Sequence, residues 1–340
     1  MDPSPKRQES PRWLPQALGY CLSAACLVWV LHGYPIKEEL VPAIRELDWK
    51  WIAVAILSDL SVYVVHGWRW NILLAPVVKL RLWRSVQAIY IGLFANEILP
   101  LRAGELIRCY LLAHWNDVRF SLVLASGVVE RLIDGFWMLA VFLLTIRFVR
   151  GVPKDLTLLV QGLGLGLLLG GIALYRIASR RRHAHALGAE RGWSSAWRHV
   201  TEGLQLMGGS RTMAQTVGIS LLYLAIQVFS VWALMKADRL DLSLWSAGAV
   251  LAIVRWWTVV PSAPGNIGLV NVACVTALKL LEVEPNDAKT FSIIYFVALT
   301  APLMIGGGIA TALAGVSITE LRGRAKRGLR AAHIHATPHR

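Results

Sequence analysis

Charged side chains are scarce in this sequence. They make up 16% of its 340 residues, whereas hydrophobic residues make up 56% and the mean hydropathy is +0.52. Soluble domains usually carry about 25% charged residues, so this composition excludes an ordinary soluble protein and indicates a polytopic membrane protein. Acidic residues are the scarcer kind, because 35 basic residues stand against 21 acidic ones and the net charge is +14.

Cysteine is also rare. The four cysteines lie in apolar segments without the paired spacing of a disulfide framework or a zinc site, so we expect packing residues. A Ser-His-Asp order, a metal-ligand cluster and a glycine-rich phosphate loop are all missing from the sequence pattern. We therefore expect no metal and no cofactor, although a catalytic Glu-His or Asp-His pair formed in space stays open.

Long apolar segments predict six membrane-spanning helices, because a span needs about 20 apolar residues. Their approximate limits are Trp13–Tyr34, Trp49–Leu74, Phe120–Phe148, Leu156–Tyr175, Thr212–Lys236 and Ala288–Gly315. The first segment follows three basic residues and is longer than the apolar core of a cleaved signal peptide. We expect it to be a signal anchor.

Two further apolar regions are interrupted. Trp83–Ala113 is broken between Leu99 and Gly104, and Leu244–Leu281 is broken by a Pro/Gly-rich stretch from Pro261 to Gly268. Each region predicts a helix, a break and a second helix, which lipid tolerates only where the backbone lines an enclosed or watery space. The alternatives are two full spans per region, giving about ten crossings, or a single kinked span.

The loop charges predict the orientation in the membrane. The segment Arg176–Arg211 carries seven arginines against two acidic residues, and the tail from Val316 carries six basic residues against one acidic residue, a net charge of +5 in each case. The segments Pro35–Lys50 and Lys279–Lys289 each carry a net charge of −1. By the positive-inside rule the two basic segments are expected in the cytoplasm and the two acidic segments outside.

Each half of the chain reads as span, span, broken hairpin, span. Three spans per half is an odd number, so the second half must be inverted. We therefore expect an all-α polytopic membrane protein with about six spanning helices and two broken re-entrant hairpins in an inverted repeat. The expected parts are a cytoplasmic N-terminus (1–12), a single membrane domain (13–315, with halves of about 13–148 and 156–315) and a basic cytoplasmic tail (316–340).

Polar and charged residues gather at the first break. They are Asn96, Glu97, Arg102, Glu105 and Arg108, and the last three are spaced i, i+3, i+6. Charges at membrane depth are costly and usually face a cavity or each other. Arginine binds phosphate well because its planar fork donates parallel hydrogen bonds, so this segment is a candidate site for an anionic ligand.

A second charged group lies in the third predicted span. Glu130 and Asp134 are four residues apart, and Arg131 is expected to pair with Asp134 at i+3. The second half contributes Arg255 before its break, then Asn266 and Asn271. The other interpretation is a self-satisfied salt-bridge network that only holds helices together. Further polar residues lie in the second span, namely Asp59, His66, Arg69 and Asn71.

These segments resemble a known family. Asn96–Arg108 and Ser126–Asp134 resemble the flippase-like membrane domain of lysylphosphatidylglycerol synthases, and Pro261–Gly268 is similar to that family's second Pro/Gly element. Asn266 stands where the family commonly has a second glycine, and Asn271 stands near an expected glutamate. The resemblance covers nearly the whole chain and implies lipid translocation without the lysyl transfer.

We therefore expect a translocase of the bacterial cytoplasmic membrane that moves an anionic phospholipid or a polyprenyl-phosphate-linked lipid. Arg102, Arg108 and Arg255 are expected to contact the headgroup, with Glu105, Glu130 and Asp134 setting the charge balance or accepting protons. The expected partners are anionic lipids and lipid-biosynthesis proteins but no nucleic acid, and the oligomeric state is open. The alternatives are a membrane enzyme acting on lipid-linked phosphate or sugar, and a partner subunit of an envelope-lipid pathway.

Overall fold

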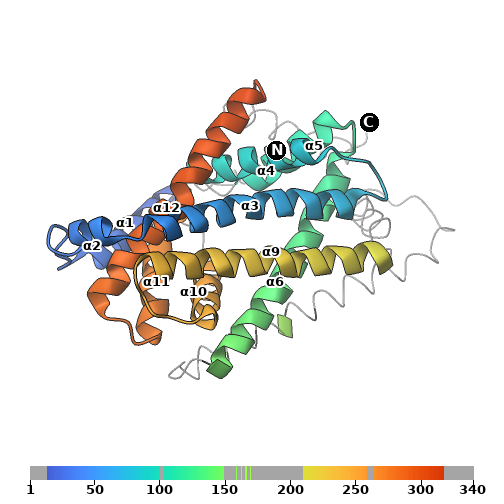
Figure 1. Ribbon diagram of the computed structural model, residues 1–340. Coiled ribbons are helices and arrows are strands. Elements are labelled where there is room, and N and C mark those ends of the chain that lie inside the picture. Colours follow the sequence, from blue (N-terminus) through green and yellow to red (C-terminus); the bar gives the residue numbers. More distant parts are fainter. Residues whose placement is uncertain are drawn as a thin grey trace, which may run out of the picture.

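The computed structural model describes residues 14–99, 103–148, 210–258 and 264–317, together with the helical residues 158, 162, 165, 166 and 169. All regular secondary structure in these residues is helical, which confirms the all-α prediction for this part of the chain (Figure 1). Three helices are long and apolar enough to cross a membrane, at Trp49–Leu74, Arg211–Ala237 and Pro285–Leu313. Together with the apolar composition, they indicate a multi-pass membrane protein.

The helices follow the predicted limits closely. They are α1 (Leu14–Leu31), α2 (Leu40–Glu46), α3 (Trp49–Leu74), α4 (Leu82–Ile98), α5 (Gly104–Trp115), α6 (Phe120–Phe148), α9 (Ser210–Ala237), α10 (Leu244–Trp257), the short 3-10 turn η3 (Pro264–Asn266), α11 (Leu269–Leu280) and α12 (Pro285–Leu313). Five predicted spans correspond to α1, α3, α6, α9 and α12. The sixth, Leu156–Tyr175, lies almost wholly outside the described residues.

Both interrupted regions form two short helices each. The first helix of the first pair ends where Leu99, the residue before a proline, takes an extended ψ of 140°. In the second pair, Gly265 and Gly268 have φ angles of 73° and 81°, in the left-handed region that favours glycine. The helices α5 and α11 have 12 residues each, which is about 18 Å of helix against a hydrocarbon core of about 30 Å.

The long helices α3 and α9 pack against each other along their length and run antiparallel (Figure 1). At one end the Asp48 N–H donates to the Ala237 carbonyl oxygen at 3.0 Å. Further along, the Ser230 hydroxyl donates to the Ala55 carbonyl oxygen at 2.8 Å. The residue number falls on one helix as it rises on the other, so the two helices point in opposite directions.

The two halves repeat the same order of helix lengths. A long helix is followed by two short ones and a second long one, in α3–α6 and again in α9–α12. The packing is reciprocal, because α4 of the first half packs against α12 of the second, while α10 of the second packs against α6 of the first. Each short pair has its own apolar core: residues around Trp70 and Ile89 surround the first, and residues around Leu251 and Phe291 surround the second.

The two acidic loops meet at one end of the molecule. The Asn286 side-chain amide donates to the Glu39 carboxylate at 3.1 Å. A cavity of about 240 Å³ lies between these loops and the end of α9, and its lining includes the four acidic residues Glu39, Glu46, Asp238 and Asp287. Burial, and next to it the Asp287 carboxylate, raise the pKa of Asp238 to about 7.

Replacing Asp238 by asparagine should change how stability depends on pH. The pKa of Asp238 is higher in the fold than its ordinary value of 3.8, so the fold favours the protonated carboxyl and loses stability as the pH rises from about 4 to 7. The Asp238→Asn variant cannot ionise there. The unfolding temperature of the variant in detergent should therefore rise relative to that of the wild type as the pH increases from 5 to 8.

The matched control is Asp241→Asn, three residues away. The side chain of Asp241 is fully exposed, and the hydrogen bond from Lys236 lowers its pKa, so this variant should show no such gain. Parallel pH profiles for the wild type and Asp238→Asn would show that the raised pKa of Asp238 is wrong.

Candidate functional site

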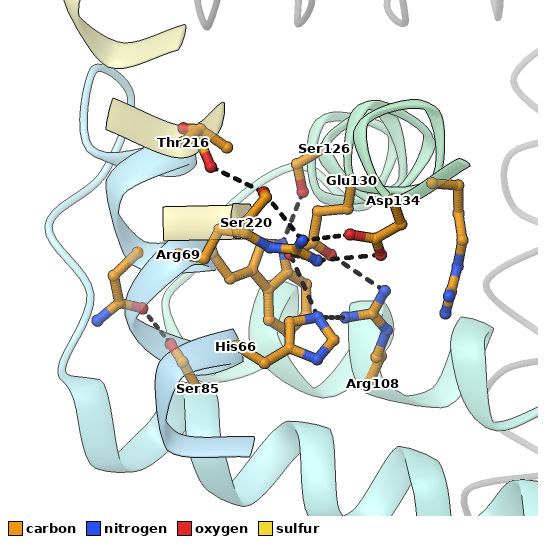
Figure 2. Close-up of polar contacts among 12 residues, drawn as sticks. His66, Arg69, Ser85, Arg108, Ser126, Glu130, Asp134, Thr216 and Ser220 are labelled. Atoms are coloured by element: carbon orange, nitrogen blue, oxygen red, sulfur yellow. Dashed lines mark hydrogen bonds and ion pairs between the residues drawn. The ribbon is translucent and has the colours of Figure 1, made fainter. Parts of the chain in front are cut away.

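A buried cluster of charged side chains joins helices α3, α5 and α6 (Figure 2). Its centre is the Glu130 carboxylate on α6, with a side chain that is 1% exposed. Arg108 Nη2 donates to Glu130 Oε2 at 3.1 Å, and Arg69 Nη2 donates to Oε1 at 3.4 Å. His66 Nε2 lies 3.3 Å from the same Oε1. The Glu130 carboxylate on α6 thus contacts side chains from both α3 and α5.

Arg69 on α3 connects this centre to α6 and α9. Its guanidinium forms a two-point ion pair with Asp134, and Nη1 also donates to the Ser220 hydroxyl at 3.1 Å. It lies over the Tyr223 ring at 4.8 Å from the ring centroid. Arg69 is fully buried, and its Nε has no hydrogen-bond partner among the described residues.

Arg108 on α5 is the second buried cation. Its Nε donates to Glu105 Oε2 at 2.9 Å, as the i, i+3 spacing predicts. Its guanidinium lies over the Trp70 ring at 4.7 Å, and the Trp70 indole N–H donates to the Ser126 hydroxyl at 2.8 Å. The 2% exposure of Arg108 means that nearly all its interactions are within the protein.

The cluster opens at Arg131. This arginine donates to Glu105, and its side chain is 56% exposed while that of Glu105 is 31% exposed. The expected ion pair between Arg131 and Asp134 is wrong. Asp134 pairs with Arg69 instead, because α3 crosses α6 at that level and places a buried guanidinium beside it. The cluster therefore runs from a dry centre at Glu130 to an accessible edge at Arg131.

The charges of the cluster balance. Three guanidiniums face three carboxylates, and His66 lies within 3.3 Å of both Glu130 and Arg108. Buried ions are tolerated when they are paired and hydrogen-bonded, and charges at membrane depth are usually arranged in this way. The paired residues are His66, Arg69, Glu105, Arg108, Glu130, Arg131 and Asp134.

A second polar group adjoins the first. The Tyr63 hydroxyl donates to the Asp59 carboxylate at 3.1 Å. Arg255 on α10 is exposed and lies within electrostatic range of Asp59, Tyr63, Tyr223 and Tyr295. Tyr223 is within the same range of Arg69 and Arg131, so it interacts with both groups. The second half of the chain thus brings its own arginine close to the cluster.

The remaining predicted residues lie at the breaks. Asn96 Oδ1 accepts the Gly104 N–H at 2.8 Å, which satisfies a free donor at the start of α5. At the start of α11, Asn271 Oδ1 accepts the Gly268 N–H at 3.3 Å. The Asn271 amide also donates to the Ser292 carbonyl oxygen at 3.0 Å. Asn266 lies in η3 with a positive φ of 49°. Arg102 lies outside the described residues.

The two breaks meet in space. A Cβ atom on Gly265, in the second break, would come within 2.8 Å of Glu97 Oε2, at the end of α4. The turn η3 packs against α4 as a whole. The two broken elements therefore approach each other at Gly265 and Glu97.

Sequence reasoning left two members out of the candidate set. His66 and Arg69 were named only as further polar residues of the second span, yet both touch Glu130. The available signal was the helical spacing of Asp59, Tyr63, His66 and Arg69–Trp70, which places them along one stripe of α3.

Comparisons with known proteins agree with the resemblance. A family model described as the lysylphosphatidylglycerol synthase TM region matches residues 16–307. A UPF0104 membrane protein of Methanothermobacter thermautotrophicus is 31% identical over 119 residues, which cover 35% of this chain and 34% of that protein. A second match to a UPF0104 membrane protein of the same organism is 20% identical over 280 residues, which cover 75% of this chain and 83% of that protein. The first alignment thus spans about a third of the relative's length. No solved structure matches the chain.

Proposed function

The chain belongs to the lysylphosphatidylglycerol synthase TM region family, and on that premise we propose that it moves an anionic lipid between the two leaflets of a membrane. The lipid is a phospholipid or a polyprenyl-phosphate-linked lipid. The observation that carries the proposal is the charge cluster with its accessible edge at Arg131. A network that only holds helices together does not require an exposed guanidinium.

Arg131 has the chemistry to hold a phosphate. A guanidinium has five N–H donors, and the ion pair with Glu105 engages one nitrogen of Arg131. The side chain is 56% exposed, so further donors are within reach of a ligand. Arg255, which is exposed and within electrostatic range of Tyr223, is the proposed second contact for the headgroup, and Arg102 at the first break is the proposed third.

Arg108 has a different part in this proposal. It already contacts Glu105, Glu130 and His66 and is nearly fully buried. We assign it to holding the cluster together, with Glu130 and Asp134, while the accessible arginines receive the headgroup.

The helix arrangement supports a path across the membrane. We infer that the two short pairs α4/α5 and α10/α11 are re-entrant hairpins of an inverted repeat, since the matching helices α3 and α9 run antiparallel and the short helices are less than a bilayer long. Opposed broken helices that meet near the midplane are a common transporter arrangement. The headgroup would pass between them while the acyl chains stay in lipid.

The orientation follows the loop charges. We place the basic segments of the chain at the cytoplasmic face of a cytoplasmic membrane, where anionic lipids attract them, and the acidic cavity around Asp238 outside.

The direct test is lipid movement in proteoliposomes. The purified protein should accelerate the exchange of fluorescent phosphatidylglycerol between leaflets, measured by quenching the outer label. Arg131→Gln and Arg255→Gln should each slow this exchange by about tenfold, as expected for the loss of one charged hydrogen bond of about 1.5 kcal/mol.

The matched control is Arg239→Gln. Arg239 forms an exposed ion pair with Glu46 at 3.2 Å, and both side chains are 67% exposed, so its loss should leave exchange unchanged. A folded wild-type protein that leaves exchange at the rate of empty liposomes would contradict the proposal. Chemical conversion of the labelled lipid would instead favour the enzyme alternative.

A further inference from the structure

His66 is the one member of the charge cluster that can change its charge near neutral pH. It is 7% exposed and points into the centre of the cluster (Figure 2). Its Nε2 lies 3.3 Å from Glu130 Oε1 and 3.2 Å from Arg108 Nη1. The other groups facing it are Arg69 on α3, Glu105 on α5 and the Tyr223 ring on α9, whose centroid is 5.5 Å from that of the imidazole.

These two contacts make opposite demands on one nitrogen. Arginine is always a donor, so the Arg108 contact needs a lone pair on His66 Nε2. The Glu130 carboxylate accepts only, so that contact needs an N–H on the same Nε2. Only one of them can be a hydrogen bond at a given moment. A proton added at Nε2 therefore favours Glu130 and displaces Arg108.

The ion pairs link this choice to the accessible edge. Arg131 pairs with Glu105, Glu105 with Arg108, and Arg108 with both His66 and Glu130. An anion that takes Arg131 leaves Glu105 to Arg108 alone. Arg108 then strengthens its ion pair with Glu105 and loses its hydrogen bond to His66. The lone pair on His66 Nε2 becomes available for a proton.

The charge count points the same way. With neutral His66 the cluster holds three cations and three anions. An added headgroup phosphate would leave it with one excess negative charge in a low-dielectric site, where an unpaired charge is costly. One proton on His66 restores neutrality.

We propose that His66 is a proton-binding site that fills together with an anionic headgroup at Arg131. One proton, taken from water, then accompanies one singly charged lipid. The identity of the ligand rests on the proposed function, but the proton site rests on the contacts of His66.

This coupling has a specific signature in proteoliposomes. A lipid with one negative charge and one proton cross together as a neutral pair, so a pH gradient should drive transport and a membrane potential should not. Fluorescent phosphatidylglycerol should accumulate in the leaflet facing the more alkaline side, approaching tenfold per pH unit at equilibrium. Protein-free liposomes give the background, and a potassium gradient with valinomycin supplies the potential.

The test variant is His66→Gln. A glutamine amide offers an oxygen to Arg108 and an N–H to Glu130, so it can satisfy both neighbours but cannot bind the proton. This variant should lose the accumulation driven by the pH gradient. His114→Gln is the control, because His114 is exposed at the end of α5 and stacks on Tyr110, and it should behave like the wild type.

A binding measurement keeps the inference testable if His66→Gln does not transport. Adding dihexanoyl-phosphatidylglycerol to the detergent-solubilised wild type in weak buffer should take up about one proton per protein, followed with a pH indicator dye. The His66→Gln variant should take up none. Equal uptake by the two proteins, or transport by the wild type that ignores the pH gradient, overturns the proton site. Absence of any lipid movement by the wild type counts against the proposed function instead.

Discussion

Replacing Glu130 by alanine is expected to lower the free energy of unfolding by about 3–5 kcal/mol, the usual cost of removing one partner from a buried ion pair. Glu130 is 1% exposed and contacts His66, Arg69 and Arg108. Its loss would leave two buried guanidiniums with one fewer carboxylate between them. Chemical unfolding in mixed detergent–lipid micelles measures the change.

Two further variants separate charge balance from packing. The double variant Glu130→Gln with Arg108→Gln removes one charge of each sign. Its loss of unfolding free energy should therefore be smaller than the sum of the losses of the two single variants. Glu46→Ala removes an exposed pair with Arg239 and should cost less than about 1 kcal/mol. A Glu130→Ala variant as stable as Glu46→Ala would show that the cluster does not hold the helices together.

The long helices were predictable because their signal is local. The predicted limits Trp49–Leu74 match those of α3. The reason is visible at its start, where the Asp48 side chain accepts the Lys50 N–H at 3.0 Å and caps the helix. The breaks were equally predictable, since Pro100 cannot donate a helical hydrogen bond and the glycines at 265 and 268 are poor helix formers that favour turns. The seven-residue α2 was missed because it is too short to show an apolar run.

The partners of the charges were not predictable in the same way. The i, i+3 rule gives the Glu105–Arg108 pair correctly, because both residues lie on one helix. The same rule fails for Arg131 and Asp134, which pair with residues on α5 and α3. Arg69 is 65 positions from Asp134 in the chain. Such a contact depends on how whole helices cross, and no spacing within one helix encodes that.

Gly104 lies at a close contact between α4 and α5 that also positions a residue of the charge cluster. It begins α5, and its backbone packs directly on that of Gly92 in α4, so a Cβ atom there would overlap the Gly92 carbonyl oxygen and come within 2.7 Å of Asn96 Oδ1. A Cβ atom on Gly92 would in turn come within 2.7 Å of the Arg108 Cβ. The close approach of α4 and α5 therefore holds Arg108 at hydrogen-bond distance from Glu130.

Gly104→Ala should consequently destabilise the protein by about 3 kcal/mol, the upper range for overpacking, because a backbone carbonyl cannot move aside as a side chain can. Gly218→Ala in α9 is the matched control, since no described residue outside the adjacent helix backbone lies within 4 Å of its added Cβ, and alanine in an open helix position should stabilise by about 0.5–1 kcal/mol. The two glycine-to-alanine changes thus have opposite expected signs. The Gly104→Ala variant should also slow lipid exchange, because pushing α5 away from α4 shifts both Glu105 and Arg108 relative to Glu130. A Gly104→Ala variant with wild-type stability and exchange would mean that the α4–α5 contact is looser than described and does not position the cluster.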